Sequence, residues 1–452
     1  MDKVTVIFSE ICGKIKPMNA VNNGPKIPLL NGDQTVENHL DYKAARIPYA
    51  RTHDSALCGN YGGEHVVDIH CVFPDFDADA DLPESYDFTL TDRYLKSIEE
   101  AGTKVFYRLG ESIEYRKKKY AILVPRDFSK WARICEHIIR HYTEGWADGF
   151  FMDIEYWEIW NEADGDAKDP IEAKRTWMGT PEEYYELYCV AAAHLKKCFP
   201  KLKIGGPAVS TLFNSDWVEN FFKYITAKPE RVPLDFFSWH LYTYDPKLFA
   251  EHSQLVRGLL EKYGYGDAES ILNEWNYNID WQERFIESVE TINSMKGAAF
   301  TAASILVAQD SPVDMLMYYD ARPNTTFNGM FDYISLEKQK TYYVISGFSD
   351  LAECENQVKA EISGDDLYCV AAANGEGYEI MLCYYSNELG MPKKTIELDL
   401  QDVLPGDAEF YLLDERSDNR LVKRESIQKD HALLHIEIEP QSVLFIKGGA
   451  LK

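Results

Sequence analysis

The feature of this chain that most limits its fold is an alternation of short β-rich runs with amphipathic helical stretches between about residues 40 and 320. Such an alternation is typical of repeated strand–helix units built around a parallel sheet. The seven clear β-rich runs are 45–51, 104–109, 154–160, 203–206, 234–239, 270–272 and 313–319. An eighth run, whose apolar pattern is weaker, lies near Ile11 to Met18.

The stretches between these runs carry helix signals. Thr180-Pro181-Glu182-Glu183 matches a capping box with proline at the first helical position. Eight strand–helix units predict an α/β fold, a (β/α)₈ TIM barrel, which we assign to residues 10–340. The competing fold is an open doubly wound sheet, which usually has a glycine-rich phosphate loop after its first strand. The sequence contains neither GxGxxG nor GxxxxGK[ST].

The pattern changes after about residue 345, where short strands follow one another without helices between them. Thr395–Leu400 and Leu434–Ile438 alternate apolar and polar residues at period two. Turn dipeptides such as Asn374-Gly375 separate the strands. We therefore predict an antiparallel β-sandwich accessory domain over residues 341–452, which an N-terminal strand at 1–9 could join.

Composition excludes several classes of partner. There are 47 Lys and Arg against 74 Asp and Glu, a net charge of −27, which argues against binding to nucleic acid or to an anionic membrane. No apolar run is long enough for a membrane span. Met1 to Val6 lacks the apolar core of a signal peptide, so we expect a cytoplasmic protein if Met1 is the natural start, and secretion if a signal was removed. No CxxC or HExxH spacing occurs, and we expect no metal site.

Two predicted strand ends carry a glutamate beside tryptophan and asparagine. The fourth strand runs into Trp160-Asn161-Glu162, and the seventh into Asn273-Glu274-Trp275. Barrel enzymes place their active sites at the carboxyl ends of the strands, so the two carboxylates can face one another. Paired carboxylates in different protonation states are what glycoside hydrolysis requires. Trp160 and Trp275 would add apolar walls for a sugar ring.

Other interpretations of these acids stay open. Glu162 and Glu274 could be solvated loop acids or helix N-caps. Asp164 is an alternative acid if the fourth strand runs two residues longer. Their strand-end positions favour Glu162 and Glu274 over the neighbouring glutamates, which are Glu155, Glu158 and Glu269.

The sequence resembles clan A glycoside hydrolases, most closely glycoside hydrolase family 39, the β-xylosidase and α-L-iduronidase family. The resemblance covers roughly residues 10–335. It implies that Glu162 is the acid/base, that Glu274 is the nucleophile, and that Asn161 bonds the sugar 2-hydroxyl. The chain departs from the family at Ala163, where proline is frequent.

Two more motifs carry the resemblance: Arg51-Thr52-His53 at the end of strand two and His240-Leu241-Tyr242 at the end of strand six. Arg51 near the nucleophile would keep Glu274 ionised, and Tyr242 would donate to the same carboxylate. We predict that His53, Asp54 and His240 bind hydroxyl groups of the sugar.

These inferences predict a retaining, exo-acting β-xylosidase-like enzyme that acts on oligosaccharides derived from plant polysaccharides such as xylan. Retention implies a carboxylate separation of about 5–5.5 Å, and inversion about 6.5–9.5 Å. The alternatives are the same mechanism on an arabinoside, galactoside or glucoside, or a non-catalytic carbohydrate-binding protein on a barrel scaffold. Acid–base and nucleophilic chemistry implies no cofactor. The sequence carries no signal for an oligomeric state.

Overall fold

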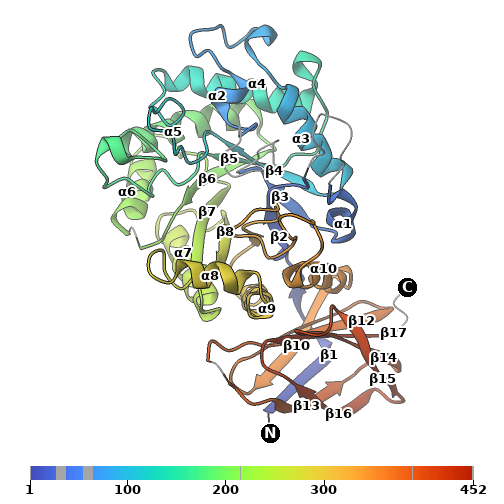
Figure 1. Ribbon diagram of the computed structural model, residues 1–452. Helices are drawn as coiled ribbons and strands as arrows, with labels where there is room; N and C mark the ends of the chain where they lie inside the picture. The colour runs from blue at the N-terminus through green and yellow to red at the C-terminus, as the bar shows by residue number, and fades with distance from the viewer. Residues whose placement is uncertain (1, 27–36, 54–64, 214, 389, 450–452) are drawn as a thin grey trace.

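The structure is a computed structural model that describes residues 2–26, 37–53, 65–213, 215–388 and 390–449. In this part of the chain, parallel strands β2 to β9 close into a barrel in chain order (Figure 1). The predicted fold class, a TIM barrel with an antiparallel β domain, is confirmed. The barrel strands are β2 (Ala20–Asn22), β3 (Tyr49–Arg51), β4 (Lys104–Leu109), β5 (Tyr156–Ile159), β6 (Lys203–Val209), β7 (Phe236–Thr243), β8 (Glu269–Tyr277) and β9 (Met315–Tyr318).

Helices surround the barrel, and their ends follow the sequence signals. The capping box at Thr180 is formed, with Glu183 as its reciprocal partner. Helix α4 starts after Asp127, whose carboxylate accepts from the Lys130 backbone N–H (3.0 Å), and stops at Gly145, which has a φ of 74°. The helices are α1 (His39–Ala44), α2 (Ile69–Val72), α3 (Thr89–Glu100), α4 (Phe128–Glu144), α5 (Pro181–Cys198), α6 (Ser215–Thr226), α7 (Lys247–Lys262), α8 (Phe285–Ile292), α9 (Met295–Gln309) and α10 (Lys340–Glu353). Among the described residues, no helix combines the length and the apolar character that crossing a membrane requires.

One predicted strand was misplaced. The first barrel strand is β2, not the run near Ile11 to Met18, and residues 11–14 instead end strand β1 of the other sheet. Strand β2 has only three residues, too few to show a hydrophobic period in the sequence. The seven other predicted runs each overlap a barrel strand.

The second domain is a single nine-stranded sheet in the order β15-β14-β17-β12-β11-β10-β1-β13-β16. The N-terminal strand β1 lies inside this sheet, antiparallel to β10 and parallel to β13. The strands at both ends of the order contribute to one hydrophobic core, so the two halves of the sheet fold towards each other. The strands are β1 (Asp2–Lys14), β10 (Asn356–Ser363), β11 (Leu367–Ala373), β12 (Gly377–Tyr384), β13 (Lys394–Gln401), β14 (Gly406–Leu413), β15 (Arg420–Ile427), β16 (His431–Ile438) and β17 (Ser442–Gly449).

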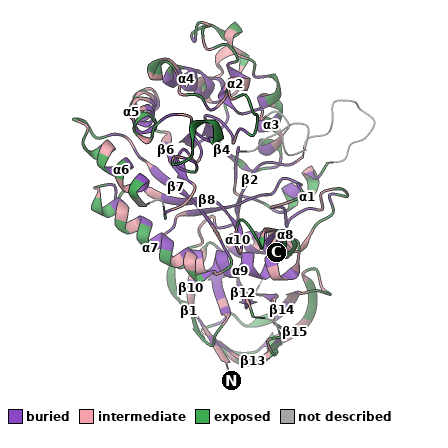
Figure 2. Cartoon of the chain, turned by 60° about the vertical axis from the view of Figure 1, so that its left-hand side comes forward, coloured by how far each residue is buried: buried purple, intermediate pink, exposed green. Residues whose placement is uncertain are grey.

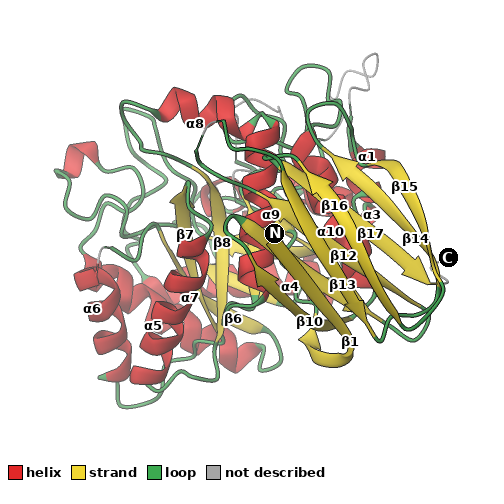
Figure 3. Ribbon diagram, turned by 90° about the horizontal axis from the view of Figure 1, so that it is seen from below, coloured by secondary structure: helices red, strands yellow, loops and turns green. Residues whose placement is uncertain are grey.

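The sheet packs against the barrel through α9 and α10, which lie between the two parts (Figures 1 and 3). Strands β12 and β17 are buried on both faces, and Figure 2 shows buried, purple segments of α9 next to the sheet. Cys383 and Phe445 belong to the core shared with the barrel, whereas Leu382 and Ile446 belong to the core inside the sheet. The contact between domains is therefore a continuous apolar core.

This contact is tight at Gly347 of α10, where a Cβ atom would lie 2.2 Å from Cε1 of buried Phe445. We expect Gly347→Ala to lower the free energy of unfolding by about 1–3 kcal/mol relative to the control Gly258→Ala, because overpacking outweighs the gain in helix propensity. Gly258 of α7 has no atom within 4 Å of such a Cβ, so its substitution should be neutral or stabilising. Urea unfolding of both variants measures the difference, and equal stabilities would contradict this packing.

Candidate active site

The backbone bends where β5 ends, and this bend positions Glu162. Trp160 and Glu162 have φ angles of 73° and 50°, a region that residues with a side chain seldom adopt. The Glu162 N–H donates to the carbonyl of Ala208 in β6 (2.9 Å), which fixes the bend. The chain therefore turns across the end of the barrel instead of continuing along the strand.

A β-bulge at Asn273 positions Glu274. The pairing of β8 with β7 skips Asn273, so this strand contains one extra residue at that point. The Asn273 amide donates to Glu158 inside the barrel, and the adjacent Glu274 also faces inward. The bulge thus breaks the strand alternation and places two neighbouring side chains in the interior.

The bulge leaves Trp275 on the outer face of β8. Its indole is fully buried against Phe249 of α7, Phe300 of α9 and Tyr318 of β9. The prediction that Trp275 forms a wall of the sugar site is therefore wrong, because this side chain packs between the barrel and its helices.

The two carboxylates meet at His240. One oxygen of each glutamate and a His240 ring nitrogen all lie within 4.8 Å of one another. His240 Nδ1 is 2.7 Å from Glu162 Oε1 and 3.7 Å from Glu274 Oε2. The Tyr242 hydroxyl donates to Glu274 Oε1 (2.7 Å). The structure thus brings together residues from three separate strand ends.

Arg51 is the centre of the hydrogen-bond network beneath this pair. It is fully buried, and its Nε donates to Glu158 Oε2 (2.7 Å). One terminal nitrogen donates to Asn22 (3.1 Å) and to Glu274 Oε2 (3.3 Å), and the other to Asn161 Oδ1 (2.6 Å). Sequence reasoning missed Asn22, and it considered Glu158 only as a competing acid. A charged residue inside an otherwise apolar strand was the available signal for Glu158.

Burial determines the protonation of this site. It raises the pKa of Glu274 to about 7, and the nearby Glu162 adds to the rise, whereas His240, Arg51 and Tyr242 oppose it. Burial also lowers the pKa of His240 to about 4, so the imidazole is neutral at neutral pH. Arg51 opposes the rise in the pKa of Glu274, as expected, but the effect of burial is larger.

The remaining predicted sugar contacts lie beside the pair. Asn161 Nδ2 is buried and has no acceptor among the described residues, while its Oδ1 is held by Arg51. His53 is buried, and its Nε2 is 3.9 Å from Glu274 Oε2. Asp54 lies outside the described residues. The alternative acid Asp164 accepts from the backbone N–H and the hydroxyl of Ser210, both at 2.8 Å.

Trp160 is almost fully buried, with its indole N–H donating to the Thr176 carbonyl (2.9 Å). Its ring contacts Trp131 and Trp177. It also borders a cavity of about 430 Å³ whose lining includes His70 and Glu111. Trp160 therefore supports the backbone next to Asn161 and lines a neighbouring cavity.

Three sets of donor side chains in the described part of the chain are close enough to share a metal ion: the Glu162–His240–Glu274 group, the Asp68–His70–Glu111 group, and the Glu136–His194–Cys198 group. In the second set, Asp68 is bonded by Arg108 and Ser112. His70 bonds Glu111 through Nδ1 (2.5 Å). All three residues of that set thus have protein partners.

The chain is similar to known proteins in sequence. Residues 56–271 match the family model described as Glycosyl hydrolases family 39, a segment that includes Glu162 and ends before Glu274. A β-xylosidase from Geobacillus stearothermophilus is 22% identical over 326 residues, which cover 62% of this chain and 60% of that protein. A β-xylosidase from Caldicellulosiruptor saccharolyticus is 30% identical over 171 residues, covering 36% and 32%. The chain thus spans less than two thirds of the length of either relative.

Solved structures share the whole fold. A glucosidase from Croceicoccus marinus superposes with a TM-score of 0.80 at 21% identity, covering 100% of this chain and 99% of that one. The GH39 enzyme from Xanthomonas axonopodis pv. citri gives a TM-score of 0.71 at 14% identity, covering 99% and 97%. The combination of barrel and sheet domain is therefore common to this chain and to these solved structures.

The raised pKa of Glu274 predicts a pH-dependent gain in stability for Glu274→Gln. Folding favours the protonated Glu274 carboxyl. Its contribution to the free energy of unfolding is therefore complete below the ordinary pKa of 4.5 and is lost as pH rises through about 7. Glutamine mimics the protonated group, and the rise from 4.5 to about 7 corresponds to about 3 kcal/mol. We expect Glu274→Gln to exceed the wild type by up to about 3 kcal/mol near pH 8 and to match it near pH 4.

Urea unfolding at both pH values measures this difference. Glu158→Gln is the matched control, because it removes the ionised partner of buried Arg51 and should destabilise the protein at both pH values. A Glu274→Gln variant that is less stable than the wild type near pH 8 would contradict the assignment.

Proposed function

We propose that the chain belongs to glycoside hydrolase family 39 and is a retaining, exo-acting β-xylosidase-like glycosidase, because residues 56–271 match that family's model and two β-xylosidases are similar in sequence. The observation that carries the proposal is the approach of Glu162 and Glu274, whose oxygens lie within 4.8 Å of each other across His240. Direct attack by one carboxylate while the other donates a proton requires a close pair, and retaining enzymes have a carboxyl separation of about 5–5.5 Å.

The neighbours of the two glutamates favour one assignment of roles. Glu274 receives hydrogen bonds from cationic Arg51 and from the Tyr242 hydroxyl, and both stabilise its ionised form. Glu162 contacts the imidazole of His240, which is neutral at neutral pH. These contacts suit Glu274 to be the nucleophile and Glu162 the acid, which are the roles that the family resemblance implies.

The reaction then takes two displacements. A Glu274 oxygen bonds to the anomeric carbon as the bond to the leaving oxygen breaks, and the leaving oxygen takes the proton of Glu162. In the second step, water gives a proton to Glu162 and attacks the same carbon, and the ester bond to Glu274 breaks. The unused amide N–H groups of Asn161 are available to a sugar hydroxyl beside the reacting carbon.

The sugar class of the proposal rests on the two relatives, both named β-xylosidases. A panel of nitrophenyl glycosides tests it, comprising the β-xyloside, β-glucoside, β-galactoside and both arabinosides. Preferred cleavage of the β-xyloside, with a β-configured first product seen by NMR, is the expected result. Preferred cleavage of another glycoside would show that the substrate is that sugar and not a β-xyloside. No cleavage of any glycoside would favour a carbohydrate-binding protein.

Alanine variants separate the two carboxylates. We expect Glu274→Ala to lower kcat by at least about 10³-fold on every substrate, because it removes the nucleophile. Glu162→Ala should impair a xylo-oligosaccharide far more than a nitrophenyl xyloside during formation of the glycosyl-enzyme, since nitrophenolate leaves without a proton. Pre-steady-state and steady-state assays of both substrates measure this contrast. Asp164→Asn is the control, and the same leaving-group dependence in that variant would assign the acid to Asp164.

Tyr242→Phe tests the nucleophile through the pH profile. With the pKa of Glu274 raised to about 7, the wild-type kcat/KM should fall as pH drops below about 7. Removing a donor to the ionised carboxylate should move this fall to higher pH and lower kcat by about 10-fold or more. Tyr244→Phe is the matched control, because that side chain is exposed. An unchanged profile in Tyr242→Phe would contradict the proposed role of the phenol.

A further inference from the structure

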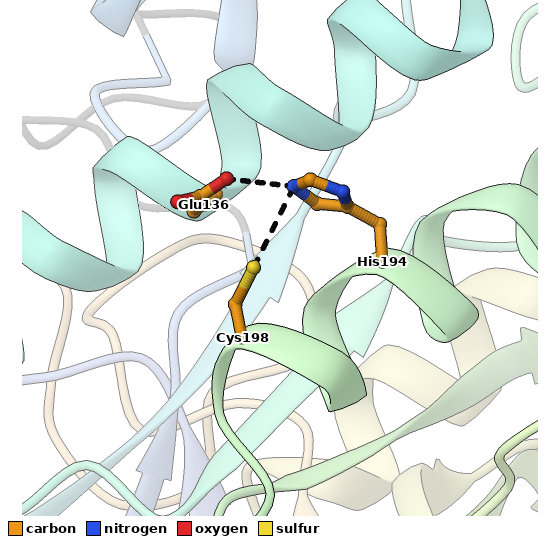
Figure 4. A group of neighbouring side chains, drawn as sticks. All are labelled: Glu136, His194 and Cys198. Atoms are coloured by element: carbon orange, nitrogen blue, oxygen red, sulfur yellow. Dashed lines mark hydrogen bonds and ion pairs between the residues drawn. The ribbon is translucent and has the colours of Figure 1, made fainter.

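Three different metal-ligand side chains meet between α4 and α5 (Figure 4). Glu136 comes from α4, and His194 and Cys198 come from α5. His194 Nε2 lies 2.7 Å from Glu136 Oε2 and 3.9 Å from Cys198 Sγ. The three donor atoms all lie within 4.8 Å of one another.

The arrangement follows from helix geometry. His194 and Cys198 are four residues apart on α5, so their side chains share one face of the helix. That face packs against α4, where Glu136 is almost fully buried. Both contacts use the same ring nitrogen, so the set is not a thiol–imidazole–carboxylate proton relay, which needs one partner at each nitrogen. The three donors instead converge on one point.

A hydrogen bond from Arg140 orients the Glu136 carboxylate toward His194. Arg140 Nε donates to Glu136 Oε1 (2.9 Å), which leaves Oε2 directed at His194. Ligating carboxylates in metal sites are commonly fixed by such a hydrogen bond. Arg133 lies 3.5 Å from Oε2 and also pairs with Asp81, so an alternative partner is available to it if a cation binds.

We propose that Glu136, His194 and Cys198 form a binding site for a zinc-class divalent ion, with water as the fourth ligand. Zinc bonds of about 2.0–2.3 Å place tetrahedral ligand atoms about 3.2–3.7 Å apart. This separation lies between the two distances from His194 Nε2, which are 2.7 Å to Glu136 Oε2 and 3.9 Å to Cys198 Sγ. Sulfur and imidazole donors select Zn²⁺, Co²⁺ or Cd²⁺ over Mg²⁺ and Ca²⁺. On binding, the Cys198 thiol loses its proton to solvent and the thiolate takes a coordination bond.

Such an ion would act on stability and not on the chemistry. Cys198 is the last residue of α5, a helix that leads away from the strand ends where the carboxylates lie. The ion would join two neighbouring helices of the outer layer, and a ligand that binds only the folded state raises Tm. The role is therefore distinct from glycoside cleavage.

Titration of the metal-free full chain with Co²⁺ tests the site, because thiolate ligation gives a charge-transfer band in the near ultraviolet. We expect the band in the wild type with one ion per chain, and its loss in Cys198→Ser and His194→Gln. The matched control is Cys71→Ser, because Cys71 Sγ lies 3.5 Å from a ring nitrogen of His70 in the second donor set. Cys71→Ser should keep the band.

Thermal unfolding with Zn²⁺ gives a second measurement. At about 100 times the dissociation constant we expect a rise in Tm of about 3 °C in the wild type and in Cys71→Ser, and none in Cys198→Ser. Circular dichroism of the metal-free variants shows whether each one folds, and two independent ligand variants keep the test decisive. A charge-transfer band that survives in folded Cys198→Ser, or no band in the wild type, would overturn the proposal.

Discussion

The buried ion pair between Arg51 and Glu158 is the interaction on which the site depends. Arg51 lies on β3, Glu158 lies on β5, and neither side chain is exposed. Because Glu158 already balances the charge of Arg51, Glu274 enters the same interior with only partial compensation. Burial then raises the pKa of Glu274 to about 7, because the opposing effect of Arg51 is smaller than the cost of burying the charge.

Two backbone irregularities then direct the reacting groups. The bulge at Asn273 allows consecutive residues of β8 to face inward, one binding Glu158 and the next bound by Tyr242. The left-handed conformations at Trp160 and Glu162 turn the chain after β5. A regular strand would send either Asn273 or Glu274 outward, so the bulge is what allows both side chains to face the interior.

The sequence predicted the elements with a repeated signal and missed those without one. The strand–helix alternation gave the barrel, and strand ends gave the neighbourhood of Glu162 and Glu274, which the structure brings together. Trp275 was misplaced because a bulge has no sequence period, and β2 because three residues carry no pattern. The set at Glu136 and His194 joins residues distant in the chain, so no local spacing could reveal it.

The sheet domain has a structural reason that bears on the site. Helix α9 is buried on nearly all sides, so the barrel alone would expose one of its apolar faces. Strands β11, β12 and β17 cover that face, and the thiol of Cys383 donates to the Ala299 carbonyl of α9 (3.3 Å). The Tyr385 hydroxyl donates to the Tyr244 carbonyl (2.8 Å), two residues after Tyr242. The sheet therefore both completes the barrel's core and holds the segment that follows the phenol donor of Glu274, which explains why barrel and sheet form one packed unit.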